Sequence, residues 1–178
     1  MEPACDWDAI ARAKGGDKTA FEELLRPAIG PAARLAYGML LDRAAAEDVV
    51  QEAALKAWRR LSNLRPDADF SPWFMGIVTN QSRTLRRGKW RSVLRLEHAE
   101  VFRGPGPEET VVHGADLRRA LRRLPADQRA AILLHFYLDL PLDAVSVALG
   151  ISVAGVKSRI NRGLKQMRPV VRGGEASV

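Results

Sequence analysis

Apolar residues recur at helical spacing along most of this 178-residue chain. Side chains of a helix are about 100° apart, so an amphipathic helix repeats its apolar positions every three or four residues. In the segment AEDVVQEAALKAWRR and the residue after it, one face carries Val50, Ala53, Ala54, Ala57 and Leu61. Strand signals are scarce, and the short alternating run AVSVAL continues a helical pattern. The sequence therefore predicts an all-α fold.

A glycine- and proline-rich stretch without helical periodicity divides the chain. Such composition is typical of a flexible linker. We expect a first helical domain at 1–96, a linker at 97–114, a second helical domain at 115–172 and a disordered tail at 173–178. Inside the first domain, Pro31 at a favourable first-turn position predicts the start of a separate helix.

Charge and cysteine content narrow the class of protein. The formal net charge of +7 and the isoelectric point near 10.2 make a polyanion a plausible partner. Cys5 is the only cysteine, so no internal disulfide forms. No apolar run approaches the roughly 20 residues that span a bilayer, and the amino-terminal residues lack the pattern of a signal peptide. We expect a cytoplasmic protein without membrane insertion.

Enzymatic chemistry has no visible constellation in this sequence. His98, His113 and His135 are scattered without a partner at metal-ligand spacing. The chain has no phosphate-cradling glycine loop and no nucleophile-elbow motif. We therefore predict no catalytic residue, no metal site and no cofactor.

The segment LPLDAVSVALGISVAGVKSRINRGLKQMR has the pattern of a helix-turn-helix. Gly150 can end a helix that begins at Leu142, and Ser152 can cap the next helix. In that second helix the expected buried stripe is Val153, Val156, Ile160, Leu164 and Met167. The outward and flanking polar set is Lys157, Ser158, Arg159, Asn161, Arg162 and Lys165. These side chains suit base edges and phosphates in a DNA major groove, whereas the alternative is a solvated basic helix.

A second basic patch follows the aromatic segment of the first domain. It includes Arg83, Arg86 and Arg87, without an intervening acid. Neighbouring aromatics can stack on single-stranded bases, although Trp73, Phe74, Ile77 and Val78 have the spacing of core residues. The polar loop LSNLRPDADF can instead hold a flipped base, which requires a shaped pocket.

Four segments, taken together and in order, resemble the bacterial extracytoplasmic-function (ECF) sigma factors. They are GDKTAFEELL, AEDVVQEAALKAWRRL, FSPWFMGIVTNQSRTLRR and LRRLPADQRAAILLHFYLDLPLDAVSVALGISVAGVKSRINRGLKQMR. The resemblance implies a transcription initiation factor with two helical DNA-binding domains, called regions two and four. Its expected partners are core RNA polymerase, through the beta-prime clamp helices and the beta flap, promoter DNA, and an anti-sigma factor of the kind that the family often has.

The resemblance also assigns roles to residues. Asp48, Gln51 and Glu52 match the polymerase-docking motif, and Leu55 falls in the same stripe. The expected contacts with the −10 promoter element are Leu64, Arg65, Asp67, Asn80, Arg83, Arg86 and Arg87. The expected contacts with the −35 element are Lys157, Ser158, Arg159, Asn161, Arg162 and Lys165.

Two other hypotheses remain open from the sequence. A helix-turn-helix regulator that binds duplex DNA without polymerase would share the second domain, but it gives no reason for the polar stripe of Asp48, Gln51 and Glu52. A basic RNA-binding protein would bind arbitrary RNA with little preference for duplex promoter DNA. The polar stripe itself can also be an ordinary solvated face.

Overall fold

The computed structural model describes residues 7–65, 68–93 and 111–173. In these residues every regular element is a helix, which confirms the predicted all-α fold. A first module (residues 7–93) contains α1 (Trp7–Lys14), α2 (Lys18–Leu40), α3 (Arg43–Arg60), the short 3₁₀ helix η1 (Leu61–Asn63) and α4 (Phe70–Val93). Most of the predicted linker and all of the predicted tail except Gly173, which ends the last helix, lie outside the described residues.

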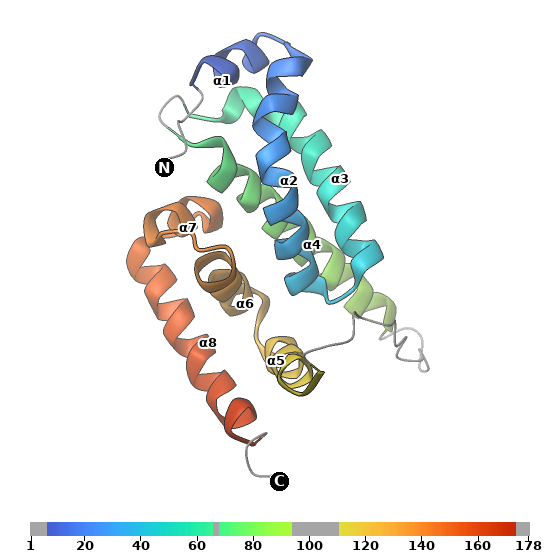
Figure 1. Cartoon of the computed structure of the whole chain (residues 1–178), viewed down its shortest axis with the longest axis vertical. Helices are drawn as coiled ribbons and strands as arrows, with labels where there is room; N and C mark the ends of the chain where they lie inside the picture. Colours follow the sequence, from blue (N-terminus) through green and yellow to red (C-terminus); the bar gives the residue numbers. More distant parts are fainter. Residues whose placement is uncertain (1–6, 66–67, 94–110, 174–178) are drawn as a thin grey trace.

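The second module (residues 111–173) is also helical. It contains α5 (Val111–Arg123), α6 (Ala126–Ile132), the π-helical turn η2 (Leu133–Tyr137), α7 (Leu142–Leu149) and α8 (Val153–Gly173). In Figure 1, α2, α3 and α4 run side by side, and α8 lies along the outer side of α6. Helix α7 packs against α4, so the two modules touch instead of standing apart.

Aromatic side chains hold the first module together. The ring of Phe21 on α2 meets Trp58 of α3 at 5.1 Å and Phe70 of α4 at 5.9 Å between centroids. Phe74 is fully buried, and Val78 one turn later is buried as well. The prediction that this aromatic segment includes core positions is therefore confirmed.

Helix α2 corrects the predicted helix start at Pro31. It runs without a break from Lys18 to Leu40, with Pro27 and Pro31 inside it. Each proline removes one backbone hydrogen bond and crowds the preceding turn, which disfavours a helix interior. The helix persists because one face buries apolar residues along its whole length, and tertiary packing of such a face supplies most helical stability.

Helix α5 corrects the expected end of the linker. It begins at Val111, inside the segment 97–114 that we expected to be irregular. We expected the irregular segment to include Gly114, but one glycine in a helix interior costs only about 1 kcal/mol relative to alanine. Packing of α5 against α8 offsets a penalty of this size.

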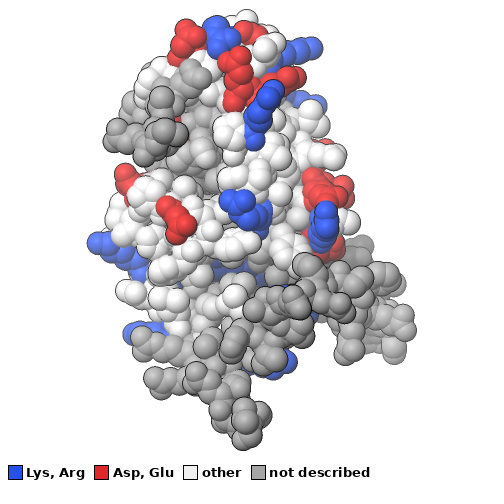
Figure 2. All heavy atoms as spheres, in the orientation of Figure 1, with Lys and Arg blue, Asp and Glu red and all other residues white. Residues whose placement is uncertain are grey.

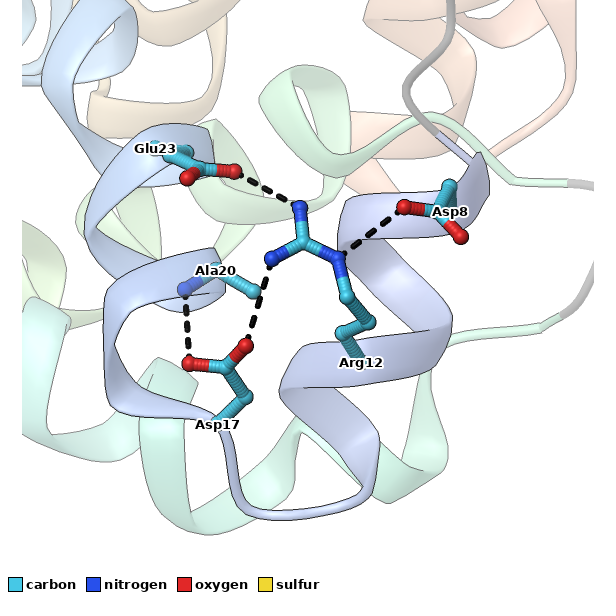
Figure 3. Close-up of polar contacts among 5 residues, drawn as sticks. All are labelled: Asp8, Arg12, Asp17, Ala20 and Glu23. Atoms are coloured by element: carbon cyan, nitrogen blue, oxygen red, sulfur yellow. Dashed lines mark hydrogen bonds and ion pairs between the residues drawn. The ribbon is translucent and has the colours of Figure 1, made fainter.

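Ion pairs connect α1 to α2 at the end of the molecule where the chain begins (Figure 3). The guanidinium of Arg12 lies 3.0 Å from the carboxylate of Asp8, 3.2 Å from that of Asp17 and 2.8 Å from that of Glu23. Asp17 is also the N-cap of α2, and its side chain accepts the Ala20 backbone N–H at 3.1 Å. The hydrogen bond from Ala20, with further help from Arg12, lowers the pKa of Asp17 below its ordinary 3.8.

This lowered pKa predicts a pH-dependent effect of Asp17→Asn. A carboxylate whose pKa is lower in the folded chain stabilises it above the unfolded-state pKa, and the stabilisation is lost as the pH falls through the folded-state pKa. We expect the variant to unfold at lower urea than the wild type at neutral pH, with a gap that closes well below pH 3.8. Urea titrations followed by circular dichroism at both pH values measure the gap. A gap of equal size at the two pH values would contradict the assignment.

Candidate functional site

The outer face of α3 carries the polar stripe singled out in the sequence. Asp48, Gln51, Glu52 and Leu55 are all exposed, and Leu55 is 50% exposed despite its apolar side chain. On the opposite face, Val50, Ala53 and Ala57 are buried in the core, and Leu61 follows them there. The predicted division of α3 into a core face and an outer face is confirmed, with Ala54 half-buried at the boundary.

A hollow of about 460 Å³ lies beside this stripe, between α3 and α4. Its lining residues are Asp42, Ala44, Ala45, Asp48, Val49, Glu52, Gln81, Thr84 and Leu85. Asp42 is the N-cap of α3 and accepts the Ala45 backbone N–H at 3.0 Å. This cap fixes the beginning of α3, which forms one side of the hollow. The α3 surface therefore combines carboxylates, an amide, an exposed leucine and a shallow groove, which suits a protein partner.

The helix-turn-helix forms as the sequence predicts. Helix α7 ends at Gly150, whose φ of 63° is the left-handed conformation that glycine adopts without strain. The Ile151 N–H donates to the Ser146 carbonyl at 3.2 Å, which closes the turn. Ser152 then accepts the Gly155 N–H through its hydroxyl at 3.2 Å and caps α8.

Helix α8 presents most of its predicted DNA-facing side chains to solvent. The exposed set is Lys157, Ser158, Asn161, Arg162 and Lys165. Arg159 differs, because its side chain is only 23% exposed and lies 3.8 Å from Asp127 of α6. In the view of Figure 2, the charged residues over the lower part of α8 are basic, whereas acidic residues gather near α1 and on the α3 side.

The buried stripe of α8 departs from the prediction at one end. Val156, Ile160 and Met167 are buried and Leu164 is half-buried, but Val153 is 37% exposed. Val153 is the first residue of the helix, where the chain leaves the turn before the packed surface begins. Gly163, which we did not include in the stripe, is buried. It lies so close to α6 that a Cβ at this position would be 2.6 Å from Ile132 Cδ1.

The predicted −10 contacts occupy different environments. Arg65, Asn80 and Arg87 are exposed, whereas Arg83 and Arg86 on α4 are half-buried against the second module. Leu64 is 2% exposed and belongs to the core, where its side chain fills the base of the loop; its contact with DNA stays a prediction. Asp67 lies outside the described residues.

A second hollow, of about 510 Å³, adjoins the loop between α3 and α4. On the loop side it is lined by Asn63, Leu64, Arg65, Ala68 and Trp73. Its other wall is the helix-turn-helix, with Ser146, Val147, Gly150, Ile151 and Ser152. The expected base pocket of the first module therefore faces the turn of the second module in this structure.

Two family models match the chain over these modules. Sigma-70 region 2 matches residues 24–92, and Sigma-70 region 4 matches residues 115–167. The ECF RNA polymerase sigma factor SigM of Mycobacterium tuberculosis is 32% identical over 88% of this chain and 80% of its own length. This chain is an ECF sigma factor.

Other relatives agree on the family and differ in length. The ECF RNA polymerase sigma factor SigE of Mycolicibacterium smegmatis is 34% identical over 86% of this chain, which spans 63% of that relative. A solved structure of CnrH with the cytosolic domain of CnrY has the same fold, with a TM-score of 0.73, 24% identity and coverage of 95% of this chain and 98% of that one. The sigma factor RpoE of Bartonella quintana, solved with the anti-sigma factor NepR, gives a TM-score of 0.67 at 22% identity, covering 85% and 96% of the two chains.

Neither a metal site nor a membrane-spanning helix is found among the described residues of this sigma factor. The part of the chain that the structure describes contains no group of three His, Cys, Asp or Glu residues that could hold a metal ion. None of its described helices is long and apolar enough to cross a membrane. Sigma factors as a family are initiation factors and not catalysts, which agrees with the lack of a catalytic motif in the sequence.

Sequence reasoning missed the arginine cluster at the contact between the modules. Arg129 of α6 is 2% exposed and donates to the Met39 carbonyl of α2 at 2.7 Å and to the Leu124 carbonyl at 3.4 Å. Burial, followed by the charges of Arg86 and Arg122, lowers the pKa of Arg129 to about 10. A signal was present, because Arg129 shares the apolar face of Ile132 and Leu133 at helical spacing.

Proposed function

We propose that this ECF sigma factor binds core RNA polymerase and directs it to promoters by recognising the −10 and −35 elements. The observation that carries the proposal is the match to region 2 and region 4 in this order, each on a folded helical module. The chain acts in the cytoplasm, where core polymerase and the chromosome are found, and it supplies recognition while the polymerase supplies catalysis.

The polymerase docks on the outer face of α3. Asp48, Gln51, Glu52 and Leu55 are exposed together beside the 460 Å³ groove. Carboxylates and an amide around an exposed leucine fit a partner that offers basic and polar side chains around an apolar one. The beta-prime clamp helices take this place in our proposal, and the second module contacts the beta flap.

The −35 element is read by α8. Asn161 and Arg162 can make paired hydrogen bonds with adenine and guanine edges in the major groove, and Ser158 can bond to either. Lys157 and Lys165 neutralise phosphates, which adds affinity that falls with salt. All five of these side chains are exposed on the helix that follows the capped turn.

The −10 element is opened by the first module. Arg65 is exposed on the loop and Asn80 is exposed on α4, and Arg83, Arg86 and Arg87 follow Asn80 along α4, where they can follow the strand backbone. Asp67 belongs to the same loop in this proposal. Capturing an unstacked base in the loop offsets the cost of flipping it, which is about a few kcal/mol. Because one chain carries both readers, binding at one element raises the effective concentration at the other.

An anti-sigma factor is the regulatory partner that we propose. RpoE of Bartonella quintana was solved with the anti-sigma factor NepR, which supports a protein partner of this class for the same fold. Such a partner would cover the exposed α3 stripe, which would block polymerase binding, or the basic face of α8, which would block DNA binding. Either of these would prevent initiation.

Reconstitution tests the proposal. We expect the purified chain to co-elute with core polymerase and to produce transcripts that start at fixed positions on genomic DNA fragments, where core polymerase alone does not. Duplex binding without polymerase binding would instead favour a helix-turn-helix regulator. Equal affinity for arbitrary RNA would favour an RNA-binding protein.

A further inference from the structure

Lys14, the last residue of α1, contacts a residue that lies 50 positions later in the chain. Its Nζ donates a hydrogen bond to the backbone carbonyl of Leu64 at 2.5 Å, at the point where the chain leaves η1. A hydrogen bond from a charged donor is stronger than one from a neutral donor. Helix α1 therefore holds the beginning of the loop that carries Arg65.

Helix α1 is itself fixed in the first module. Its buried residues are Ala9, Ile10 and Ala13. Arg12 pairs with the N-cap Asp17 and with Glu23 of α2, which ties α1 to the longer helix (Figure 3). Because α1 is held in this way, Lys14 can determine the orientation of the Leu64 carbonyl instead of following it.

The bond from Lys14 sets the direction in which the chain leaves the core at Leu64. The Leu64 side chain is 2% exposed, so packing fixes its position. The Leu64 carbonyl and the Arg65 N–H belong to one planar peptide unit, so orienting the carbonyl also orients the beginning of Arg65. The Arg65 carbonyl in turn accepts the Ala68 N–H at 3.1 Å. Burial of Leu64 and the bond from Lys14 together determine where the exposed Arg65 lies.

Aromatic packing holds the far end of the same loop. Phe70, the first residue of α4, is 5% exposed, and its ring stacks on that of Phe74 with the centroids 5.7 Å apart. Phe21 of α2 meets the same ring at 5.9 Å. A change at Lys14 should therefore alter the near end of the loop and leave the far end in place.

We propose that Lys14 is a positioning residue for recognition of the −10 element: it orients the Leu64 carbonyl and thereby places Arg65 for contact with the bases. The inference rests on the proposed function, because it takes Arg65 as a −10 contact. A contact that is placed before binding favours the correct ligand, since less ordering is needed when the complex forms. Helix α1 thus contributes to promoter selectivity through the loop, without a contact of its own with DNA.

Lys14→Met is the direct test, and Lys18→Met is its matched control. Both substitutions remove one positive charge from an exposed lysine, and both leave an unbranched side chain. Because both positions are exposed, we expect both variants to fold, which circular dichroism checks. Lys14→Arg is the conservative variant, since it keeps a charged donor at the end of α1.

Hydrogen–deuterium exchange of the free chain measures the contact without DNA or polymerase. The Leu64 N–H donates to the Leu61 carbonyl at 3.0 Å, and the Ala68 N–H donates to the Arg65 carbonyl at 3.1 Å. We expect both amides to exchange faster in Lys14→Met, because the near end of the loop opens more often. Lys18→Met and Lys14→Arg should exchange as the wild type does.

Two promoter duplexes that differ only in the −10 element measure recognition by the polymerase complex. One carries the −10 element identified from mapped transcript starts, and the other carries it scrambled. We expect Lys14→Met to lose about fivefold of the preference for the first duplex, if the loop is then correctly placed about a fifth of the time. Lys14→Arg should restore most of the preference, and Lys18→Met should match the wild type.

Three results would overturn the positioning role. A direct phosphate contact by Lys14 would weaken binding to both duplexes equally and make the slope of log K against log salt shallower by about 0.9. A merely structural role would lower the urea midpoint and leave the preference unchanged. The third result is unchanged exchange at Leu64 and Ala68. A wild type that did not distinguish the two duplexes would instead refute the proposed function, and the −10 role of Lys14 with it.

Discussion

Replacing Asp48 and Gln51 together by alanine should weaken binding to core RNA polymerase by about thirtyfold or more. We expect the pair to act as a binding hot spot, and truncating a hot spot costs at least about 2 kcal/mol, which corresponds to about thirtyfold in Kd. Both side chains are exposed on α3, so they are accessible to a partner and contribute little to the core. Titration of labelled chain with core polymerase measures the loss, and circular dichroism shows that the helices remain.

The control for this double substitution is Glu22→Ala. It also removes one negative charge from an exposed helix position, but on α2 instead of α3. We expect its affinity for polymerase to equal that of the wild type. Unchanged binding of the double variant would mean that the α3 stripe is only a solvated face.

Asn161→Ala should reduce the preference for a −35 duplex over a scrambled duplex by about fivefold to 150-fold. A paired hydrogen bond to a base edge is worth about 1–3 kcal/mol of discrimination, and this range converts to those factors. Asn161 is exposed in the third turn of α8, beyond the Ser152 cap. Mapped transcript starts first identify the −35 element. Competition between the −35 duplex and the scrambled duplex for the polymerase complex then measures the preference.

Lys165→Gln distinguishes base reading from phosphate binding on the same helix. Losing one phosphate contact should weaken binding to both duplexes equally and lower the salt slope by about 0.9. Asn161→Ala should leave the salt slope unchanged, because asparagine carries no charge. If Asn161→Ala instead weakened binding to both duplexes equally, Asn161 would contribute to DNA affinity but would not read a base.

Local patterns predicted the local structure of this chain well. The core and outer faces of α3 follow from helical spacing alone, and the turn at Gly150 and the cap at Ser152 follow from side-chain chemistry. These features depend on residues within a few positions of one another. Leu64 shows the limit, because a leucine in a polar loop gives no local sign that it completes a core.

Contacts between distant segments were not predictable from spacing. Arg83 and Arg86 form part of an open basic run in the sequence, yet α6 contacts Arg83 and α5 contacts Arg86 from more than 30 residues downstream. The continuity of α2 through Pro27 and Pro31 likewise depends on neighbours along its whole buried face. A local rule about proline describes the cost of such a helix but not the packing that outweighs it.

The two prolines of α2 also affect its mechanics. A proline has no amide hydrogen, so the carbonyls of Glu23 and Pro27 each lack the usual donor four residues later. Positions four residues apart lie on the same side of a helix, which places both missing bonds along one line. Helix α2 can therefore flex there without breaking a backbone bond. Ion pairs anchor the first half of α2 to α1, and the Met39 carbonyl in its last turn accepts a hydrogen bond from Arg129 of α6. The segment with the two missing bonds lies between these two anchors. It therefore separates a part of α2 that is fixed to α1 from a part that can follow the second module.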